Sequence, residues 1–185
     1  MKITKFSLLA AAALCLCGSA MAQGYVGIAA GPSHFSLDCT GATSCDNNDT
    51  AFKVVGGYSF GNGFSAELGY VSFGKAKAAD SSVTAEMKAA GPTLGIAYQH
   101  QFNREWGTGV RLGVSNMKTT MSGTVSGLGS ATLSETNATP YYGFAVNYML
   151  AKNWKVEAGL DFSKAEIRSE KGTVRALTLG AAYAF

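Results

Sequence analysis

Hydrophobic and polar residues alternate with a period of two along the last thirteen residues, 173–185. The larger side chains share one face, and they are Leu177, Leu179, Ala181, Tyr183 and Phe185. Small or polar residues occupy the positions between them. A period of two is typical of a β-strand whose two faces meet different surroundings. The chain is therefore expected to end on a strand with an aromatic residue at its carboxyl terminus.

The same alternation recurs in seven earlier segments, which are separated by polar stretches rich in glycine, serine and asparagine. Such runs, bounded by turn-forming residues, predict strands. The eight expected strands cover residues 24–37, 51–60, 64–73, 87–102, 106–117, 139–150, 154–163 and 173–185.

The connections between these strands alternate in length. Tight turns are expected at 61–63, 103–105 and 151–153, and long polar loops at 38–50, 74–86, 118–138 and 164–172. The pattern predicts an all-β fold: an eight-stranded antiparallel up-and-down transmembrane β-barrel with short periplasmic turns and long extracellular loops. The strand lengths suit a tilted crossing of a bilayer, which needs about 9–11 residues.

The amino-terminal residues have the pattern of an export signal. Lys2 and Lys5 precede an apolar run over 6–17, and Ala20-Met21-Ala22 matches a signal-peptidase site. The run is shorter than the about 20 residues that a transmembrane helix needs. We therefore assign residues 1–22 to a cleaved signal peptide and 23–185 to the barrel domain. Cys15 and Cys17 raise the alternative of a lipoprotein, but each follows a leucine rather than a small residue.

The charge balance of the chain is nearly neutral. The sequence has 15 Lys and Arg against 12 Asp and Glu, a net charge of +3, and loss of Lys2 and Lys5 lowers it to +1. This balance does not favour a nucleic-acid partner. The sequence also contains no phosphate-binding loop and no metal-ligating cluster, so we expect neither a cofactor nor a metal.

Two cysteines, Cys39 and Cys45, remain after the signal is removed. An even pair in an exported protein predicts a disulfide. The ring would be small, so it would contribute only about 2–3 kcal/mol, mainly locally. Asp46 and Asp49 lie beside it, and we interpret them as solvated loop charges rather than a cation site.

Aromatic residues indicate which face of the strands meets lipid. One group lies beside the short turns: Phe60, Phe64, Phe102, Trp106, Tyr148, Trp154, Tyr183 and Phe185. A second group lies near the far ends of the strands: Phe35, Phe52, Tyr70, Tyr142 and Phe162. Two aromatic rows that bracket an apolar band are typical of a barrel in lipid. The opposite face is mostly small, as the interior of an eight-stranded barrel requires, and this disfavours a soluble lipocalin-like barrel.

Charged residues share the inward parity of their strands. Because breaking a buried ion pair costs roughly 3–5 kcal/mol, such charges should be paired. We expect one linked salt-bridge network that plugs the lumen, formed by Lys53, Glu67, Arg111 and Glu157. Lys155 and Asp161 are expected to lie near the barrel ends in contact with water. General diffusion porins, by contrast, have about 16–18 strands.

Over its mature length the chain resembles the small eight-stranded outer-membrane barrels, which include the membrane domain of outer-membrane protein A and the OmpX/Ail-type proteins. The resemblance rests on the YVGIAAG opening (25–31), on GYSFGNGFSAELGY (57–70) and on the LGAAYAF ending (179–185). It implies residence in the outer membrane of a Gram-negative bacterium. It also implies that the barrel-assembly machinery reads Phe185.

Three function classes follow. The first is a structural or surface-interaction role through the extracellular loops, for which OmpX/Ail-type relatives imply adhesion or defence. The second is a narrow conduit for ions or small hydrophobic molecules. The third is an enzyme that modifies lipid A, because His34-Phe35-Ser36 is similar to the His-x-Ser of the lipid A deacylases. That pair lies late in the deacylases but in the first strand here, and His100 has outward parity, so we expect no enzyme.

The expected partners follow from the location. They are the lipid bilayer, lipopolysaccharide, the barrel-assembly machinery and a host or cell-surface ligand. The barrel is expected to be a monomer.

Overall fold

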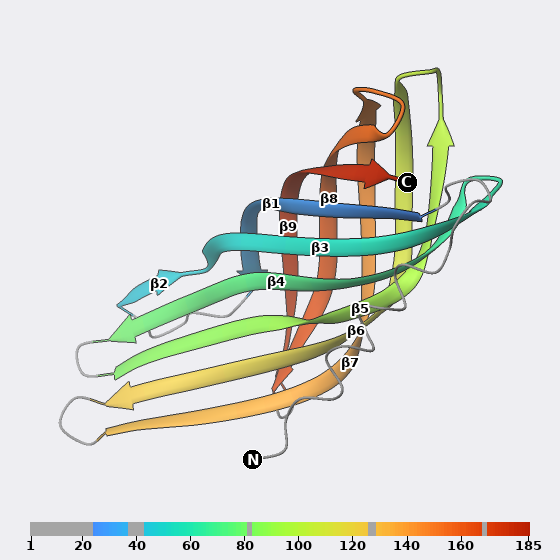
Figure 1. Cartoon of the computed structure of the whole chain (residues 1–185). Helices are drawn as coiled ribbons and strands as arrows, with labels where there is room; N and C mark the ends of the chain where they lie inside the picture. The colour runs from blue at the N-terminus through green and yellow to red at the C-terminus, as the bar shows by residue number, and fades with distance from the viewer. Residues whose placement is uncertain (1–23, 37–42, 81–82, 126–128, 168–169) are drawn as a thin grey trace, which may run out of the picture.

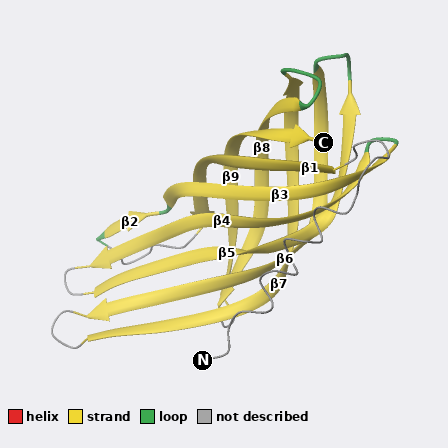
Figure 2. Cartoon of the chain, viewed as in Figure 1, coloured by secondary structure: helices red, strands yellow, loops and turns green. Residues whose placement is uncertain are grey.

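The computed structural model describes residues 24–36, 43–80, 83–125, 129–167 and 170–185. The expected signal peptide and Cys39 lie outside these ranges. Strands make up almost all of the described chain (Figure 2). They are β1 (Gly24–Ser36), β2 (Ser44–Asp46), β3 (Asn48–Gly61), β4 (Phe64–Asp80), β5 (Val83–Gln101), β6 (Trp106–Val125), β7 (Gly129–Met149), β8 (Trp154–Ile167) and β9 (Glu170–Ala184). Within the described residues, no helix is long and apolar enough to cross a membrane.

Eight of the strands close into an antiparallel barrel (Figure 1). Neighbours along the chain pair with each other, β1 pairs with both β3 and β9, and the β4–β5 ladder completes the ring. The short strand β2 lies outside the ring and pairs with β4. The prediction of an eight-stranded up-and-down barrel is therefore confirmed.

The short turns depend on residues that can adopt unusual backbone angles or cap the chain. Gly61, Asn62 and Gly63 all have positive φ, at 81°, 53° and 82°. A Cβ on Gly63 would also come within 2.3 Å of the carbonyl oxygen of Gln99. In the next turn, Oδ1 of Asn103 accepts the backbone N–H groups of Glu105 and Trp106 at 2.9 and 2.7 Å. Positive φ angles and side-chain capping restrict which residues can form these turns, and this is why the turns could be predicted from the sequence.

At the opposite end the strands run well beyond their predicted limits. The expected loops 74–86 and 118–138 are mostly strand, because β4 continues to Asp80, β5 begins at Val83, β6 continues to Val125 and β7 begins at Gly129. The expected loop 38–50 contains β2 and the start of β3. The alternation that marks a membrane strand is lost here because both faces of a sheet outside the bilayer can meet water.

The outer parts of β4–β7 continue the barrel sheet as a four-stranded extension. The β7–β8 ladder ends at Tyr142↔Phe162, whereas β7 stays paired with β6 as far as Val125↔Gly129. In Figure 1 the hairpin ends of β4–β5 and β6–β7 extend together, well away from the β8–β9 hairpin. We call this extension the projecting sheet, and define it as residues 75–80, 83–90, 117–125 and 129–138.

The two faces of the barrel wall differ as the sequence predicted. Leu179 and Leu68 are 69% and 63% exposed on the outside, whereas Lys53 and Arg111 are 5% and 6% exposed. The short-turn aromatic residues also lie on the outer surface. Four of them pack in cross-strand pairs, with ring centroids 5.0 Å apart for Trp106–Tyr148 and also for Trp154–Tyr183.

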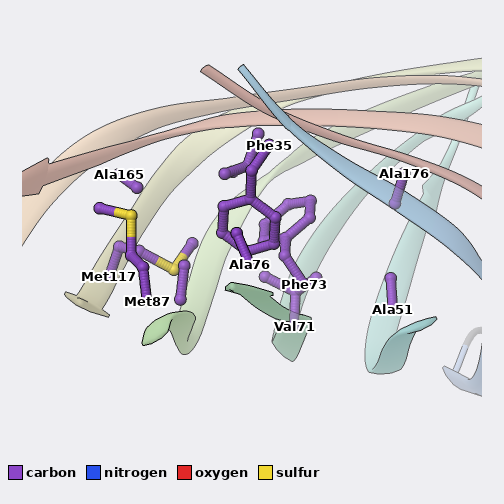
Figure 3. Close-up of a cluster of buried hydrophobic side chains, with 11 residues drawn as sticks. Phe35, Ala51, Val71, Phe73, Ala76, Met87, Met117, Ala165 and Ala176 are labelled. Atoms are coloured by element: carbon purple, nitrogen blue, oxygen red, sulfur yellow. The ribbon is translucent and has the colours of Figure 1, made fainter. Parts of the chain in front are cut away.

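The lumen near the projecting sheet is filled by apolar side chains (Figure 3). The cluster contains Phe35, Ala51, Val71, Phe73, Ala76, Met87, Ala89, Met117, Ala165, Val174 and Ala176. Phe35 is fully buried there, so its assignment to the outer aromatic row is wrong: its odd position in β1 turns it inward beside Ser33. Phe73, Met87 and Met117 also fill the interior, so the expectation of a mostly small inner face is wrong in this half of the barrel.

Candidate functional site

The half of the lumen near the short turns is centred on Arg111 of β6. Its Nε lies 2.9 Å from Oε2 of Glu67, and its Nη2 lies 2.8 Å from Oε1 of Glu157. Glu67 comes from β4 and Glu157 from β8, so the guanidinium crosses the interior. The planar guanidinium presents five donors and suits this bridging role better than an ammonium group.

Lys53 is bound to a different acid from the one expected. Its Nζ lies 2.6 Å from Oδ2 of Asp161, which is 1% exposed. Asp161 also accepts hydrogen bonds from Tyr141 Oη at 2.5 Å and Thr178 Oγ1 at 3.2 Å. The expectation that Asp161 is hydrated near a barrel end is therefore wrong. The expected single network is instead two groups, one around Arg111 and one around Asp161.

Lys155 is also largely shielded from water, rather than fully hydrated as expected. Its side chain is 12% exposed, its Nζ lies 3.8 Å from Oε2 of Glu157, and it stands 5.1 Å from the ring centroid of Tyr25. Tyr25 in turn donates from its hydroxyl to Oε1 of Glu67 at 2.5 Å. Sequence reasoning missed Tyr25, although its parity in β1 with Gly27 and Ala29 placed it inside.

These six charged side chains balance one another. Lys53, Arg111 and Lys155 face Glu67, Glu157 and Asp161, and each acid lies within 4 Å of a base. A cavity of about 20 Å³ remains beside Tyr25, Lys53, Arg111, Lys155 and Glu157. That volume is close to the space of one water molecule. The charged side chains therefore leave little free space beside Tyr25 in this part of the interior.

A layer of hydroxyl groups separates the charged layer from the apolar cluster. Ser115 Oγ lies 2.9 Å from both Thr139 Oγ1 and Ser163 Oγ, and the latter two are 3.2 Å apart. All three residues are buried. They come from β6, β7 and β8, and they tie these strands together just where the β7–β8 ladder ends.

The outer face of the projecting sheet carries a lysine patch, which we define as Lys75, Lys77, Lys88 and Lys118. Glu86 lies within it, with Oε1 2.9 Å from Lys88 Nζ and Oε2 3.6 Å from Lys75 Nζ. The hydrogen bond from Lys88 and the charges of Lys75 and Lys77 hold the pKa of the Glu86 carboxyl below its ordinary value. Hydroxyl pairs continue the polar face, with Thr120–Ser134 at 3.0 Å and Ser122–Thr132 at 3.3 Å.

The inner face of the projecting sheet carries exposed apolar side chains. Met121 and Leu133, which are paired across β6 and β7, are 37% and 46% exposed.

The β4 edge of the projecting sheet is covered, because Ser44–Asp46 of β2 pairs with residues 77–79. Cys45 of β2 forms a disulfide, and Cys39, its predicted partner, lies outside the described residues. Residues 129–134 form the other edge, and in the described structure their ladder partner is β6.

The residues that suggested lipid A chemistry do not assemble a catalytic pair. Nδ1 of His34 lies 3.0 Å from Oδ1 of Asn48, on the exposed outer side of the barrel. His100 stacks edge-on against Phe102, with ring centroids 5.4 Å apart, at the short-turn rim. Across the described ranges, no group of three or more His, Cys, Asp or Glu side chains could hold a metal ion.

Comparisons with known proteins agree with this architecture. A family model described as the outer membrane protein beta-barrel domain matches residues 7–185. No curated protein matches the chain in sequence.

Several solved structures share the fold. The chain is similar to Ail, the attachment invasion locus protein of Yersinia pestis, at 17% identity, with 88% of this chain and 99% of Ail covered and a TM-score of 0.57. Neisserial surface protein A matches at 16% identity, with 88% and 97% covered and a TM-score of 0.58. OprG from Pseudomonas aeruginosa matches at 15%, with 89% and 97% covered and a TM-score of 0.51. At such low identities these structural matches show a shared fold and nothing more.

Proposed function

Because the chain belongs to the outer membrane protein beta-barrel family, we propose that it acts as a surface-interaction protein, binding a partner through the projecting sheet while its lumen stays closed. The observation that carries the proposal is the continuation of β4–β7 as a paired sheet beyond the β7–β8 ladder, which ends at Tyr142↔Phe162. This sheet presents a backbone edge and exposed apolar side chains outside the membrane.

The edge of β7 supports a partner that binds as an added strand. An exposed edge strand offers free N–H and C=O groups, and proteins usually protect such edges with lysine, proline or a bulge. Residues 129–134 carry no charged residue and no proline. The β4 edge, by contrast, is covered by β2. An extended segment of a partner protein could therefore add to β7 by main-chain hydrogen bonding.

The inner face supplies side-chain contacts for such a segment. Leu133 lies in the edge strand itself, and Met121 lies opposite it on β6. The side chains of Met121 and Leu133 are 37% and 46% exposed. Exposed apolar side chains next to a pairing edge would give the added strand a preference for apolar residues at alternate positions.

The interior supports a closed lumen rather than a conduit. The Arg111 and Asp161 groups cross the barrel at the short-turn half, and the apolar cluster with Phe35 and Phe73 fills the opposite half. An ion would have to displace paired charges and then cross an apolar layer, which is costly for an unpaired charge. The His34 imidazole contacts Asn48 Oδ1. This contact with an amide supports a non-enzymatic role.

A relative gives an example of a ligand at this kind of barrel. Ail has been crystallised in complex with the heparin analogue sucrose octasulfate. For this chain we expect a host or cell-surface ligand, recognition of Phe185 by the barrel-assembly machinery and a monomeric state.

The adhesion of bacteria that produce the full chain tests the proposal. Cells of a non-adherent laboratory strain with the chain should bind cultured epithelial monolayers more than cells with an empty vector. Leu133→Lys should lower this binding severalfold, because it places a charge on the apolar face beside the edge. Thr124→Lys is the matched control, since it adds the same charge on the outward face of β6, away from the β7 edge.

Two further measurements keep the result interpretable. A heat-modifiability gel establishes that each variant is folded in the outer membrane. Planar-bilayer recordings of the purified protein should give no steady openings. Adhesion equal to that of the vector, or an equal loss in both lysine variants, would contradict the partner proposal, and steady openings would contradict the closed lumen.

A further inference from the structure

The lysine patch lies just beyond the lipid-facing surface of the barrel. Along the outward face of β6, Val114 is followed by Asn116 and then Lys118, and along β5 Leu94 is followed by Pro92, Ala90 and Lys88. Four strand residues at about 3.3 Å each, tilted by about 40°, place Lys118 about 10 Å further from the bilayer centre than Val114. A long lysine side chain reaches from there into the lipid headgroup layer.

The charge on this face is almost entirely positive. In the described parts of β4–β7, Glu86 is the one acid whose parity turns it outward beyond the apolar band, and four lysines accompany it. Lys88 and Lys75 already bind Glu86, so one carboxylate is shared between two ammonium groups. The rim at the short turns is different, because Arg104 and Lys152 are accompanied there by Glu105. The basic excess therefore lies at the outer rim of this wall.

We propose that the lysine patch binds the phosphate groups of the phosphorylated glycolipid in the outer leaflet, the lipid A part of lipopolysaccharide. The proposal is independent of the β7 edge, since it uses the outward face of the sheet and requires only the outer-membrane location. Lys75, Lys88 and Lys118 supply the ammonium groups, and Lys77 adds a fourth at the upper margin.

The arrangement fits an anchored phosphorylated sugar better than a soluble one. Lys75 is paired with Lys88, and Ala90, two residues along β5, is paired with Lys118, so the ammonium groups stand on three adjacent strands about 4.8 Å apart. The hydroxyl groups of Thr120 and Ser134 lie next to Lys88 and can meet sugar hydroxyls. Directly below, Leu94 and Val114 offer the apolar surface that acyl chains of the same lipid would cover.

Binding of purified, folded full-length barrel to bisphosphorylated lipid A tests the proposal. Native mass spectrometry at low salt gives the lipid concentration at which half of the barrel carries lipid. The comparison ligand is the same lipid A after both phosphates are removed chemically. Wild-type protein should prefer the phosphorylated lipid.

Matched variants locate the site. A lysine near an anionic membrane surface contributes roughly fivefold in affinity at low salt. The double variant Lys88→Gln with Lys118→Gln should therefore weaken binding by between about fivefold and twenty-fivefold. The double variant Arg104→Gln with Lys152→Gln removes two charges from the opposite rim and should leave the affinity unchanged. Glu86→Gln should tighten binding, by up to about fivefold, because it removes the acid that competes for Lys88.

The possible results separate clearly. Equal binding of phosphorylated and dephosphorylated lipid A by wild-type protein overturns the proposal. Equal losses in the two double variants also overturn it, because they would indicate a general effect of net charge. A soluble sulfated polysaccharide that needs Lys88 and Lys118 while lipid A does not would assign the patch to a soluble ligand instead. If the Lys88 and Lys118 variant does not fold, the tightening expected for Glu86→Gln decides the question.

Discussion

Nε of Arg111 lies 2.9 Å from Oε2 of Glu67 inside a barrel wall whose outer surface is apolar. The same guanidinium binds Glu157 from the other side. One cation thus serves two buried carboxylates, and its removal would leave both without their main partner.

Arg111→Met is therefore expected to destabilise the folded barrel by about 3–5 kcal/mol, since Glu67 and Glu157 would remain buried without it. The measurement is the denaturant midpoint for unfolding from phospholipid vesicles, read by the heat-modifiability shift. Arg104→Met, in an exposed turn, is the control and should stay within about 0.5 kcal/mol of wild type. A similar loss in the two variants would show that Arg111 is not a buried bridge.

The separation into two charged groups predicts where energetic coupling lies. Lys53 and Asp161 are in direct contact at 2.6 Å, so a double-mutant cycle with Lys53→Met and Asp161→Leu should give a coupling of about 0.5–3 kcal/mol. The cycle between Lys53→Met and Arg111→Met should give a smaller value. A larger coupling in the second cycle would restore the single linked network that the sequence suggested.

The apolar cluster predicts a difference between phenylalanines on the two sides of the wall. Phe73→Ala removes a fully buried ring from the lumen and should cost about 3–5 kcal/mol. Phe52→Ala removes a ring that is 47% exposed on the outer surface, where lipid can fill the space, and should cost less. Both values come from unfolding in vesicles. A larger loss for Phe52 would mean that the interior of this half is not packed.

The disulfide at Cys45 is predicted to hold β2 against the edge of β4. Non-reducing peptide mapping should recover Cys39 joined to Cys45. Reduction, or Cys45→Ser, should speed amide hydrogen exchange at residues 77–79, which pair with β2. Exchange in the β6–β7 hairpin around Ser122 serves as the internal reference. Unchanged protection at 77–79 would show that β2 stays paired without the disulfide.

The sequence predicted the barrel wall well because lipid imposes a strict rule on it. Residues such as Leu112 and Leu179 must face hydrocarbon, and the small or charged residues between them must face inward, so the alternation is strong. The turns could be predicted because their backbone geometry restricts the residues that fit. The turn at Gly61-Asn62-Gly63, for example, has positive φ at all three residues. Strand number, strand order and the lipid-facing side all followed from these two signals.

Neither the projecting sheet nor the pairing of the interior charges is constrained in this way by lipid or by turn geometry. Residues 120–125 and 129–138 form strands outside the closed barrel, where neither face must be apolar, and the Ser/Thr-rich sequence was interpreted as a loop. The choice of partner for Lys53 depends on which strands meet across the lumen, and parity along one strand does not contain that information. Asp161 and Lys155 were misplaced because distance from a turn was used as a measure of hydration, whereas Tyr141 and Tyr25 exclude water from them.

The equality of charge inside the lumen has a consequence for the response of the barrel to voltage. Lys53, Arg111 and Lys155 are matched one for one by Glu67, Glu157 and Asp161 in the described interior. A potential difference across the membrane would pull these groups in opposite directions with no net force on the layer. The charged groups as a set would therefore feel no net displacing force when the ionic composition, and with it the Donnan potential, changes outside the cell.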